Sequence, residues 1–193
     1  MTSRFFAFLS RMKYIDRWGL MRCTTKENVA EHSLFATWVA HALAVIENKY
    51  FGGAFDPCKI GMIAAYHETG EVITGDMPTP IKYFSPEISA AYKKVEKVAE
   101  DRILATLPSD LTEDFAALVQ PSGEDKRLVK YADKLTAYIK CVEEIACGNA
   151  EFKKASESIY RELKGFGSKS VDYFLDTFVE AYKLSLDELS VTN

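Results

Sequence analysis

The sequence lacks the features of a membrane protein, a secreted protein or a protein that binds nucleic-acid polymers. Its longest apolar run, residues 34–46, is too short to span a bilayer and contains His41. The first residues show no apolar stretch followed by a small-residue cleavage site, so they do not indicate a signal peptide. The net charge is −4 and no basic stripe is present, which argues against a nucleic-acid polymer as a partner. We therefore expect a soluble protein of the cytoplasm that binds neither a membrane nor a nucleic-acid polymer.

Cysteine is scarce, and its spacing is uninformative for metal binding. The four cysteines form neither a CxxC pair nor the spacing of a zinc ribbon; they are Cys23, Cys58, Cys141 and Cys147. The last two lie in one helical pattern, where a disulfide has little reason to form. Reduced thiols are the usual form of cysteine in cytosolic proteins, so the cysteines also favour a location in the cytoplasm.

Strand patterns, internal repeats and flexible linkers are also absent. Apolar residues instead recur at helical spacing, in segments that we place at residues 5–15, 28–48, 57–71, 86–107, 111–119, 125–147, 151–163 and 169–182, with a short turn at 185–188. Pro78 and Pro80 predict an irregular stretch over 76–80. A chain of 193 residues is long enough to enclose one sizeable core. The sequence therefore predicts an all-α fold, with one domain over residues 1–193 that forms a compact helical bundle.

Histidine occurs only three times, and one histidine lies in a run of polar groups. The run His67-Glu68-Thr69-Gly70-Glu71 ends a helix whose earlier residues are apolar. Burying such groups without partners would be costly. We therefore interpret His67 and Glu68 as metal ligands and Glu71 as a group that takes part in the chemistry. Successive helical residues diverge by about 100°, so the two ligands can meet one ion only near a helix end, which Gly70 predicts.

The other two histidines lie nine residues apart on one predicted helix. They point to opposite faces and cannot share an ion. We expect His41 in the core or between helices. His32 alone would have the same interpretation, but it gains a role if it meets the pair His67-Glu68 and Asp133 of a later helix. Two imidazoles and two carboxylates suit a divalent transition metal.

Several of these residues have simpler alternatives. Glu71 could be a helix-end carboxylate in solvent, and Asp133 could form an ion pair between helices with Arg17 or Lys134. Arg17 and Trp18 lie in a stretch without a clear period. They could hold an anion and a ring, or Trp18 could fill the core while Arg17 stays in solvent.

The motifs of the sequence resemble those of a known family. The pattern of its histidines and carboxylates is similar to the H…HD…D signature of the HD-domain metal-dependent phosphohydrolases. Nearly the whole chain resembles the bacterial 5′-deoxynucleotidases of that superfamily. The resemblance is carried by FFAFLSR at 5–11, RW at 17–18, ENVAEHSL at 27–34, YHE at 66–68, TGDMPTPIKYF at 74–84, AD at 132–133 and LSLDE at 184–188.

The resemblance implies an all-α enzyme of the HD-domain type, usually a homodimer, that removes phosphate from deoxyribonucleoside 5′-monophosphates. It implies one divalent transition-metal ion, which could be Co, Mn, Ni, Zn or Cu, bound by His32, His67, Glu68 and Asp133. Arg17 would orient the phosphate and Glu71 would take part in catalysis. Arg17 would contact the substrate, and Trp18 would lie against its sugar. The nucleoside would be contacted by Asp76, Met77, Pro78 and Thr79. The substrate would also be contacted by three of the metal ligands, His32, Glu68 and Asp133.

One residue departs from the family pattern, because glutamate occupies position 68 where the family has aspartate. The additional methylene keeps the charge but moves the carboxylate by about one bond length, and metal ligands are sensitive to such shifts. We expect Glu68 to remain a ligand; the alternative is binding through water. Two alternatives to the main prediction remain open. One is an HD-type hydrolase of another nucleotide phosphate ester, and the other is a non-catalytic module that binds metal or nucleotide.

Overall fold

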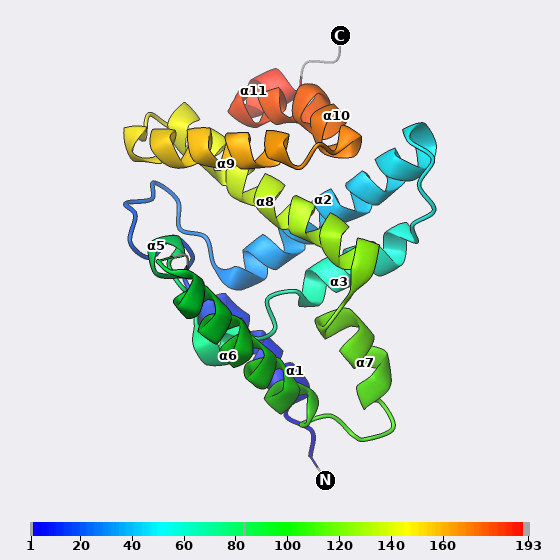
Figure 1. Cartoon of the computed structure of the whole chain (residues 1–193). Coiled ribbons are helices and arrows are strands. Elements are labelled where there is room, and N and C mark those ends of the chain that lie inside the picture. The colour runs from blue at the N-terminus through cyan, green and yellow to red at the C-terminus, as the bar shows by residue number, and fades with distance from the viewer. Residues whose placement is uncertain (1, 83, 191–193) are drawn as a thin grey trace.

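The computed structural model describes residues 2–82 and 84–190, and this part of the chain contains helices and no strand (Figure 1). The predicted all-α fold is confirmed. Met1, Tyr83 and residues 191–193 of the predicted domain lie outside the described residues. The helices are α1 (Phe5–Leu9), η1 (Ser10–Tyr14), α2 (Val29–Tyr50), α3 (Pro57–Tyr66), α4 (Glu71–Thr74), α5 (Thr79–Lys82), α6 (Pro86–Leu104), α7 (Thr112–Val119), α8 (Gly123–Ala146), η2 (Ala150–Phe152), α9 (Lys153–Gly165), α10 (Lys169–Phe178), η3 (Val179–Lys183) and α11 (Leu186–Leu189).

Two long helices, α2 and α8, cross in the middle of the molecule and enclose the main core together with α3 and α10 (Figure 1). Leu43 of α2, Ile60 of α3 and Leu135 of α8 are fully buried there. Full burial of such a side chain contributes about 1.5–3 kcal/mol of transfer free energy. The crossing therefore fixes α2, α3 and α8, the three helices that will position the site, relative to one another.

A second, smaller core joins the N-terminal helix to α6 and α7. Phe5 of α1 is fully buried, and its ring packs edge-on against Phe115 of α7 with the centroids 5.2 Å apart. Ile103 of α6 is buried beside them. Tyr66, the last residue of α3, packs against this cluster. The second core thus holds the point at which α3 ends.

Side-chain caps set the starts of α2 and α3. The Asn28 side chain accepts the Glu31 N–H at 3.0 Å, and the Glu31 carboxylate accepts the Asn28 N–H at 3.1 Å, which forms a capping box. Asp56 caps α3, and Pro57 occupies its first position. The capping box fixes the first turn of α2, where His32 lies.

The structure differs from several sequence-based expectations. The helix expected over 57–71 ends at Tyr66, and a turn separates α3 from α4. The helix expected over 5–15 becomes a 3₁₀ helix at Ser10. The stretch 76–80 is helical from Thr79, since proline is tolerated in the first turn of a helix. His41 is an exposed residue of α2, so the expected place in the core is wrong, whereas its Cβ atom faces Gly61 of α3 at the contact between the two helices.

Among the described helices, α2 is long and apolar enough to cross a membrane by length and composition alone, although the apolar run 34–46 is shorter. Its best 18-residue window has a mean hydropathy of 1.3, and half of that window is buried inside the fold. The core helix of a soluble protein meets the same criteria. The contacts of α2 with α3 and α8 account for its buried half.

Candidate active site

The four predicted metal ligands come together between three helices. His32 lies in the first turn of α2, His67 and Glu68 lie in the turn after α3, and Asp133 lies on α8. One nitrogen or oxygen atom of each residue lies within 4.8 Å of the others. Nε2 of His32 is 3.0 Å from Oδ1 of Asp133, and Nε2 of His67 is 3.4 Å from Oε1 of Glu68. Two imidazoles and two carboxylates at this spacing form a donor set for one divalent transition-metal ion.

The orientation of His67 provides a test of whether these residues fit a metal. Its Nδ1 donates to the Ala64 carbonyl at 2.6 Å, which directs the lone pair of Nε2 into the cluster. Nε2 is buried and has no hydrogen-bond partner, although carboxylate oxygens of Glu68 and Asp133 lie 3.4 and 4.0 Å away. A lone pair that faces two carboxylates needs a proton or a metal cation between them. The residues therefore fit a metal ion.

Thr136 orients His32 from the next turn of α8. Its hydroxyl donates to the Asp133 carbonyl at 2.7 Å and lies 3.4 Å from Nδ1 of His32. Because this oxygen gives its own proton to a carbonyl, it can accept the proton of Nδ1, which leaves Nε2 available to an ion. Sequence reasoning missed Thr136; its position three residues after Asp133 was the available signal.

The charges of the clustered groups shift one another's pKa values. Burial and the charge of Arg17 lower the pKa of His32. For His67, burial is outweighed by Glu68 and Asp133, which raise its pKa. Burial of Asp133 is outweighed by the hydrogen bond with His32 and by the nearby charge of the two histidines, and its pKa is held well below the usual range. Metal ligands must be deprotonated, so binding of an ion would release any proton that these groups hold.

Glu71, the first residue of α4, is buried near the cluster. The residue is 8% exposed, and its Oε2 atom has no hydrogen-bond partner. Burial and the neighbouring carboxylates of Glu68 and Asp76 raise its pKa to about 10. The alternative of a helix-end carboxylate in solvent is therefore wrong. The group is protonated at neutral pH unless positive charge is added to the site.

Arg17 lies at the edge of the cluster, in the loop of residues 15–28 between η1 and α2 (the 15–28 loop). Its side chain is 11% exposed, with Nη1 3.5 Å from Oε1 of Glu68 and Nε 3.4 Å from Oε2 of Glu27. Burial is outweighed by the nearby carboxylates, Glu68 first, which raise its pKa. The alternative in which Arg17 stays in solvent is wrong. Its permanent positive charge is available to an anion beside the metal ligands.

Trp18 has a backbone conformation that bulky residues rarely adopt, with φ 59°. Its indole N–H donates to Oε2 of Glu27 at 3.0 Å, and its ring packs against Phe152 with the centroids 5.3 Å apart. The side chain is half-buried. Glu27 was not predicted as a site residue. It lies in the ENVAEHSL stretch, but no sequence pattern identifies its partners.

The stretch after α4 lies beside Arg17 and Trp18. Burial raises the pKa of Asp76, while the charge of Arg17 and a hydrogen bond from the Trp18 backbone N–H oppose that effect. Asp76 is therefore close to both residues of the 15–28 loop. Of the other three predicted nucleoside contacts, two are half-buried and the last is exposed at the start of α5; they are Met77, Pro78 and Thr79.

Two lysines near the site each form an ion pair with a glutamate of another helix. Lys82 of α5 forms an ion pair with Glu96 of α6 at 2.9 Å and acts to lower the pKa of Glu71. Sequence reasoning missed Lys82, although it lies in the TGDMPTPIKYF stretch. Lys134, a suggested partner of Asp133, instead pairs with Glu162 at 3.2 Å.

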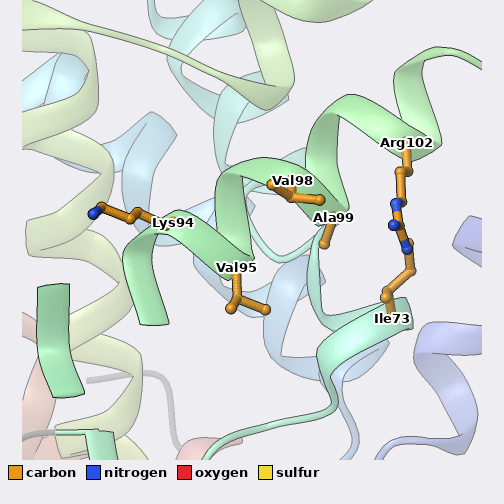
Figure 2. A pocket seen from close by; sticks show the side chains of 6 residues that line it. All are labelled: Ile73, Lys94, Val95, Val98, Ala99 and Arg102. Carbon is orange, nitrogen blue, oxygen red and sulfur yellow. The ribbon is translucent and has the colours of Figure 1, made fainter. Parts of the chain in front are cut away.

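A groove of about 240 Å³ lies outside the cluster, between α4 and α6 (Figure 2). It is mainly apolar and is lined by Ile73, Lys94, Val95, Val98, Ala99 and Arg102. None of these side chains is a metal ligand in the usual sense. The groove therefore offers no second site for the chemistry of the cluster.

Comparison with known proteins identifies relatives of the whole chain. The family of 5′-deoxynucleotidase YfbR-like proteins matches residues 4–182. A 5′-deoxynucleotidase of Vibrio parahaemolyticus serotype O3:K6 is 49% identical over 191 residues, which cover 97% of this chain and 98% of the relative. A 5′-deoxynucleotidase of Yersinia pestis is 50% identical over 192 residues, which cover 98% of each chain.

Solved structures show the same fold. An HD-domain phosphohydrolase from Listeria innocua superimposes with a TM-score of 0.81 at 21% identity, over 97% of this chain and 92% of that one. A cyanophage S-2L HD phosphohydrolase, solved with dA and one catalytic Zn²⁺ ion, superimposes with a TM-score of 0.62 at 20% identity, over 92% of this chain and 95% of that one. At these identities the likeness concerns the fold alone. It confirms the predicted HD-domain type of helical bundle.

Proposed function

The chain belongs to the 5′-deoxynucleotidase YfbR-like family, and on this premise we propose that it is a metal-dependent hydrolase that converts deoxyribonucleoside 5′-monophosphates to deoxyribonucleosides and phosphate. The observation that carries the proposal is the position of Arg17, whose Nη1 lies 3.5 Å from Glu68 of the four-residue cluster. A phosphate dianion repels nucleophiles, so its hydrolysis needs positive charge on more than one side. A metal ion held by the cluster and the guanidinium of Arg17 would together supply that charge.

The metal would be held by His32, His67, Glu68 and Asp133. The unpartnered Nε2 of His67 and the mixed nitrogen and oxygen donors support this assignment. When bound, a divalent ion supplies charge that polarises a phosphate oxygen and makes water a better nucleophile. Ligand type leaves Co, Mn, Ni, Zn and Cu open. The reach of Glu68 Oε1 to within 3.4 Å of His67 Nε2 supports direct binding by the longer side chain.

Arg17 and Glu71 are the proposed catalytic residues. The planar guanidinium of Arg17 can hold two phosphate oxygens and orient the group. Glu71 would hold the attacking water and, in its ionised form, accept its proton. The pKa of about 10 in the metal-free protein reflects burial first. Arg17 and Lys82 oppose this effect.

The nucleoside would lie on the other side of Arg17. Trp18 would press against the sugar carbon C2′, where a ribose hydroxyl would lose its water without gaining a partner. Asp76, which is close to Trp18, and the following Met77, Pro78 and Thr79 would contact the nucleoside. His32, Glu68 and Asp133 would contact the phosphate through the same groups that hold the metal.

We also propose that one domain over 1–193 acts in the cytoplasm as a homodimer. The described cysteines are all free, which suits a reducing compartment. An exposed apolar face of α2 supports self-association, with Leu34, Trp38 and Val45 exposed by 51%, 56% and 39%. Glu31 and Lys49 bound this face.

Glu31 and Lys49 lie equally far from Ala40, so near-antiparallel pairing of two α2 helices would place opposite charges together. Light scattering should give the mass of a dimer for the wild type and of a monomer for Trp38→Glu. The matched control Leu186→Glu changes a side chain that is 79% exposed on α11 and should remain dimeric. A monomeric wild type would contradict the proposal.

The function is tested by phosphate release from a panel of nucleotides with added Co²⁺, Mn²⁺ or Zn²⁺. We expect turnover of deoxyribonucleoside monophosphates that is abolished by chelation and by His67→Ala. The panel includes a cyclic nucleotide and a deoxynucleoside triphosphate, because preference for either would favour another HD-type hydrolase. Metal binding without turnover of any member would favour a non-catalytic module.

A further inference from the structure

The 15–28 loop carries both Arg17 and Trp18, and one carboxylate in the loop contacts both. Oε2 of Glu27 accepts the Trp18 indole N–H at 3.0 Å and lies 3.4 Å from Nε of Arg17. The Glu27 side chain is only 17% exposed. The same residue also accepts the Arg17 backbone N–H at its carbonyl, at 2.9 Å. Glu27 thus holds the two neighbouring residues by side chain and backbone.

The direction of the Arg17 side chain follows from this contact. Nε forms an ion pair with Oε2 of Glu27 at 3.4 Å without a hydrogen bond, and the outer nitrogen Nη1 is presented to Glu68 at the edge of the cluster. A guanidinium is planar and rigid, so fixing one edge fixes the direction of the others. Glu27 therefore sets which donors remain for a phosphate.

The Trp18 backbone shows that its position is enforced by its surroundings. A bulky residue at φ 59° persists only where several contacts determine it. Glu27 holds the indole N–H, Phe152 covers the ring, and the Trp18 carbonyl accepts the Met21 N–H at 2.8 Å. Of these contacts, only the one to Glu27 also involves the phosphate-binding arginine.

We propose that Glu27 is a positioning residue that locks Arg17 and Trp18 into one fixed arrangement and thereby sets the selectivity for deoxyribose over ribose. The inference rests on the proposed function, because it assigns the phosphate to Arg17 and the sugar to Trp18. Glu27 acts through these two residues and needs no contact with the substrate. The distance between the phosphate and C2′ of a nucleotide is restricted by its covalent structure. A fixed relation between guanidinium and indole can therefore distinguish the two sugars.

The experiment uses Trp38→Phe as the background, because the chain has two tryptophans and this change leaves Trp18 as the only fluorophore of its kind. Glu27→Ala removes both contacts, whereas Glu27→Gln keeps a carbonyl oxygen for the indole. Glu151→Ala is the matched control. Its carboxylate also holds the 15–28 loop, through Nε of Arg22 at 2.6 Å, but touches neither Arg17 nor Trp18.

We expect Glu27→Ala to shift the Trp18 emission to longer wavelength and to reduce the ratio of kcat/KM for dAMP over AMP by about tenfold, as for loss of one charged hydrogen bond. Glu27→Gln should keep the wild-type emission, because its carbonyl accepts the indole N–H, and should lose part of the ratio, because it carries no charge toward Arg17. Glu151→Ala should keep both. Thermal unfolding of each variant confirms that folded proteins are compared.

Wild-type emission and ratio in Glu27→Ala would overturn the proposal. Equal changes in Glu151→Ala would also overturn it, because they would assign the effect to general loosening of the loop. The emission needs no substrate. A wild type that hydrolyses no deoxyribonucleotide would therefore overturn the proposed function, while the emission would still decide whether Glu27 positions Trp18.

Discussion

At the scale of single residues, Glu68 contacts both parts of the site. Its Oε1 atom lies 3.4 Å from Nε2 of His67, 3.9 Å from Nε2 of His32 and 3.5 Å from Nη1 of Arg17. One oxygen therefore lies between the two histidines and the arginine. An aspartate on the same backbone would be one methylene shorter, and the turn after α3 would have to move to make the same three contacts.

Two substitutions at Glu68 test separately how the charge and the length of its side chain contribute to metal binding. Glu68→Gln keeps the length and removes the charge, so we expect the affinity for Mn²⁺ or Co²⁺ to fall by at least about tenfold. Glu68→Asp keeps the charge and should retain metal binding with a weaker contact to Arg17. Isothermal titration measures both affinities. Undiminished affinity in Glu68→Gln would show that position 68 is not a ligand.

Trp18 allows a paired test of backbone strain. At φ 59° a side chain costs about 1 kcal/mol relative to glycine, so Trp18→Gly should be more stable than Trp18→Ala by about that amount. Denaturant unfolding measures the difference. Both variants lack the indole, and both should narrow the gap between dAMP and AMP hydrolysis. An unchanged gap would remove Trp18 from sugar selection.

At the scale of elements, the turn of residues 67–70 is the feature that sequence periodicity did not reveal. The pattern predicted a helix through Glu71, with Gly70 marking its end. In the structure Gly70 has φ −61°, a value that any residue adopts, so it does not end the helix by a left-handed turn. Tyr66 instead anchors the end of α3 in the second core. That contact joins residues far apart in sequence and leaves no local signal.

A second carboxylate fixes the 15–28 loop to α8. Glu144 accepts the Thr24 N–H and hydroxyl at 2.8 and 2.7 Å and the Thr25 N–H at 3.2 Å. It also accepts from Lys140 at 2.6 Å and from Asn149 at 2.8 Å. Burial is outweighed by these donors, with Lys140 first, and the pKa of Glu144 falls to about 2.

The Glu144 contacts predict a pH dependence of stability. Because its folded-state pKa is below the ordinary value of 4.5, the carboxylate stabilises the fold above that pH. This contribution is lost as the pH falls from about 4.5 toward 2. The free energy of unfolding should therefore decline more steeply in this window for the wild type than for Glu144→Gln. Parallel curves would contradict the assignment. Groups common to both proteins cancel in the difference.

At the scale of the whole molecule, the cluster of His32, His67, Glu68 and Asp133 joins α2, the turn after α3 and α8. His32 and Asp133 are 101 residues apart, and no periodic pattern connects them. Composition and periodicity predicted the helices. The common site was predicted because the motifs resemble a known family. Glu27 and Thr136 were missed since their roles depend on contacts that form only in the folded chain.

A cluster that joins three elements predicts stabilisation by its ion. An ion that binds only the folded state at a hundred times its Kd adds about 2.7 kcal/mol, or roughly 5–10 °C in Tm for a chain of this size. Thermal unfolding with Mn²⁺ or Co²⁺, against EDTA, measures the shift. His67→Ala should show little of it. An equal shift in that variant would place the ion elsewhere.

The isolated bridge between Asp16 and Asn28 closes the 15–28 loop at its base. Backbone hydrogen bonds from Arg17 to Glu27 and from Val29 to Ile15, at 2.9 and 3.0 Å, form this closure. The tip residues Gly19 and Leu20 are exposed beyond it. Insertions or substitutions at the tip therefore need not disturb the base of the loop. In evolution the loop can change in length and surface character while the geometry at its base is kept.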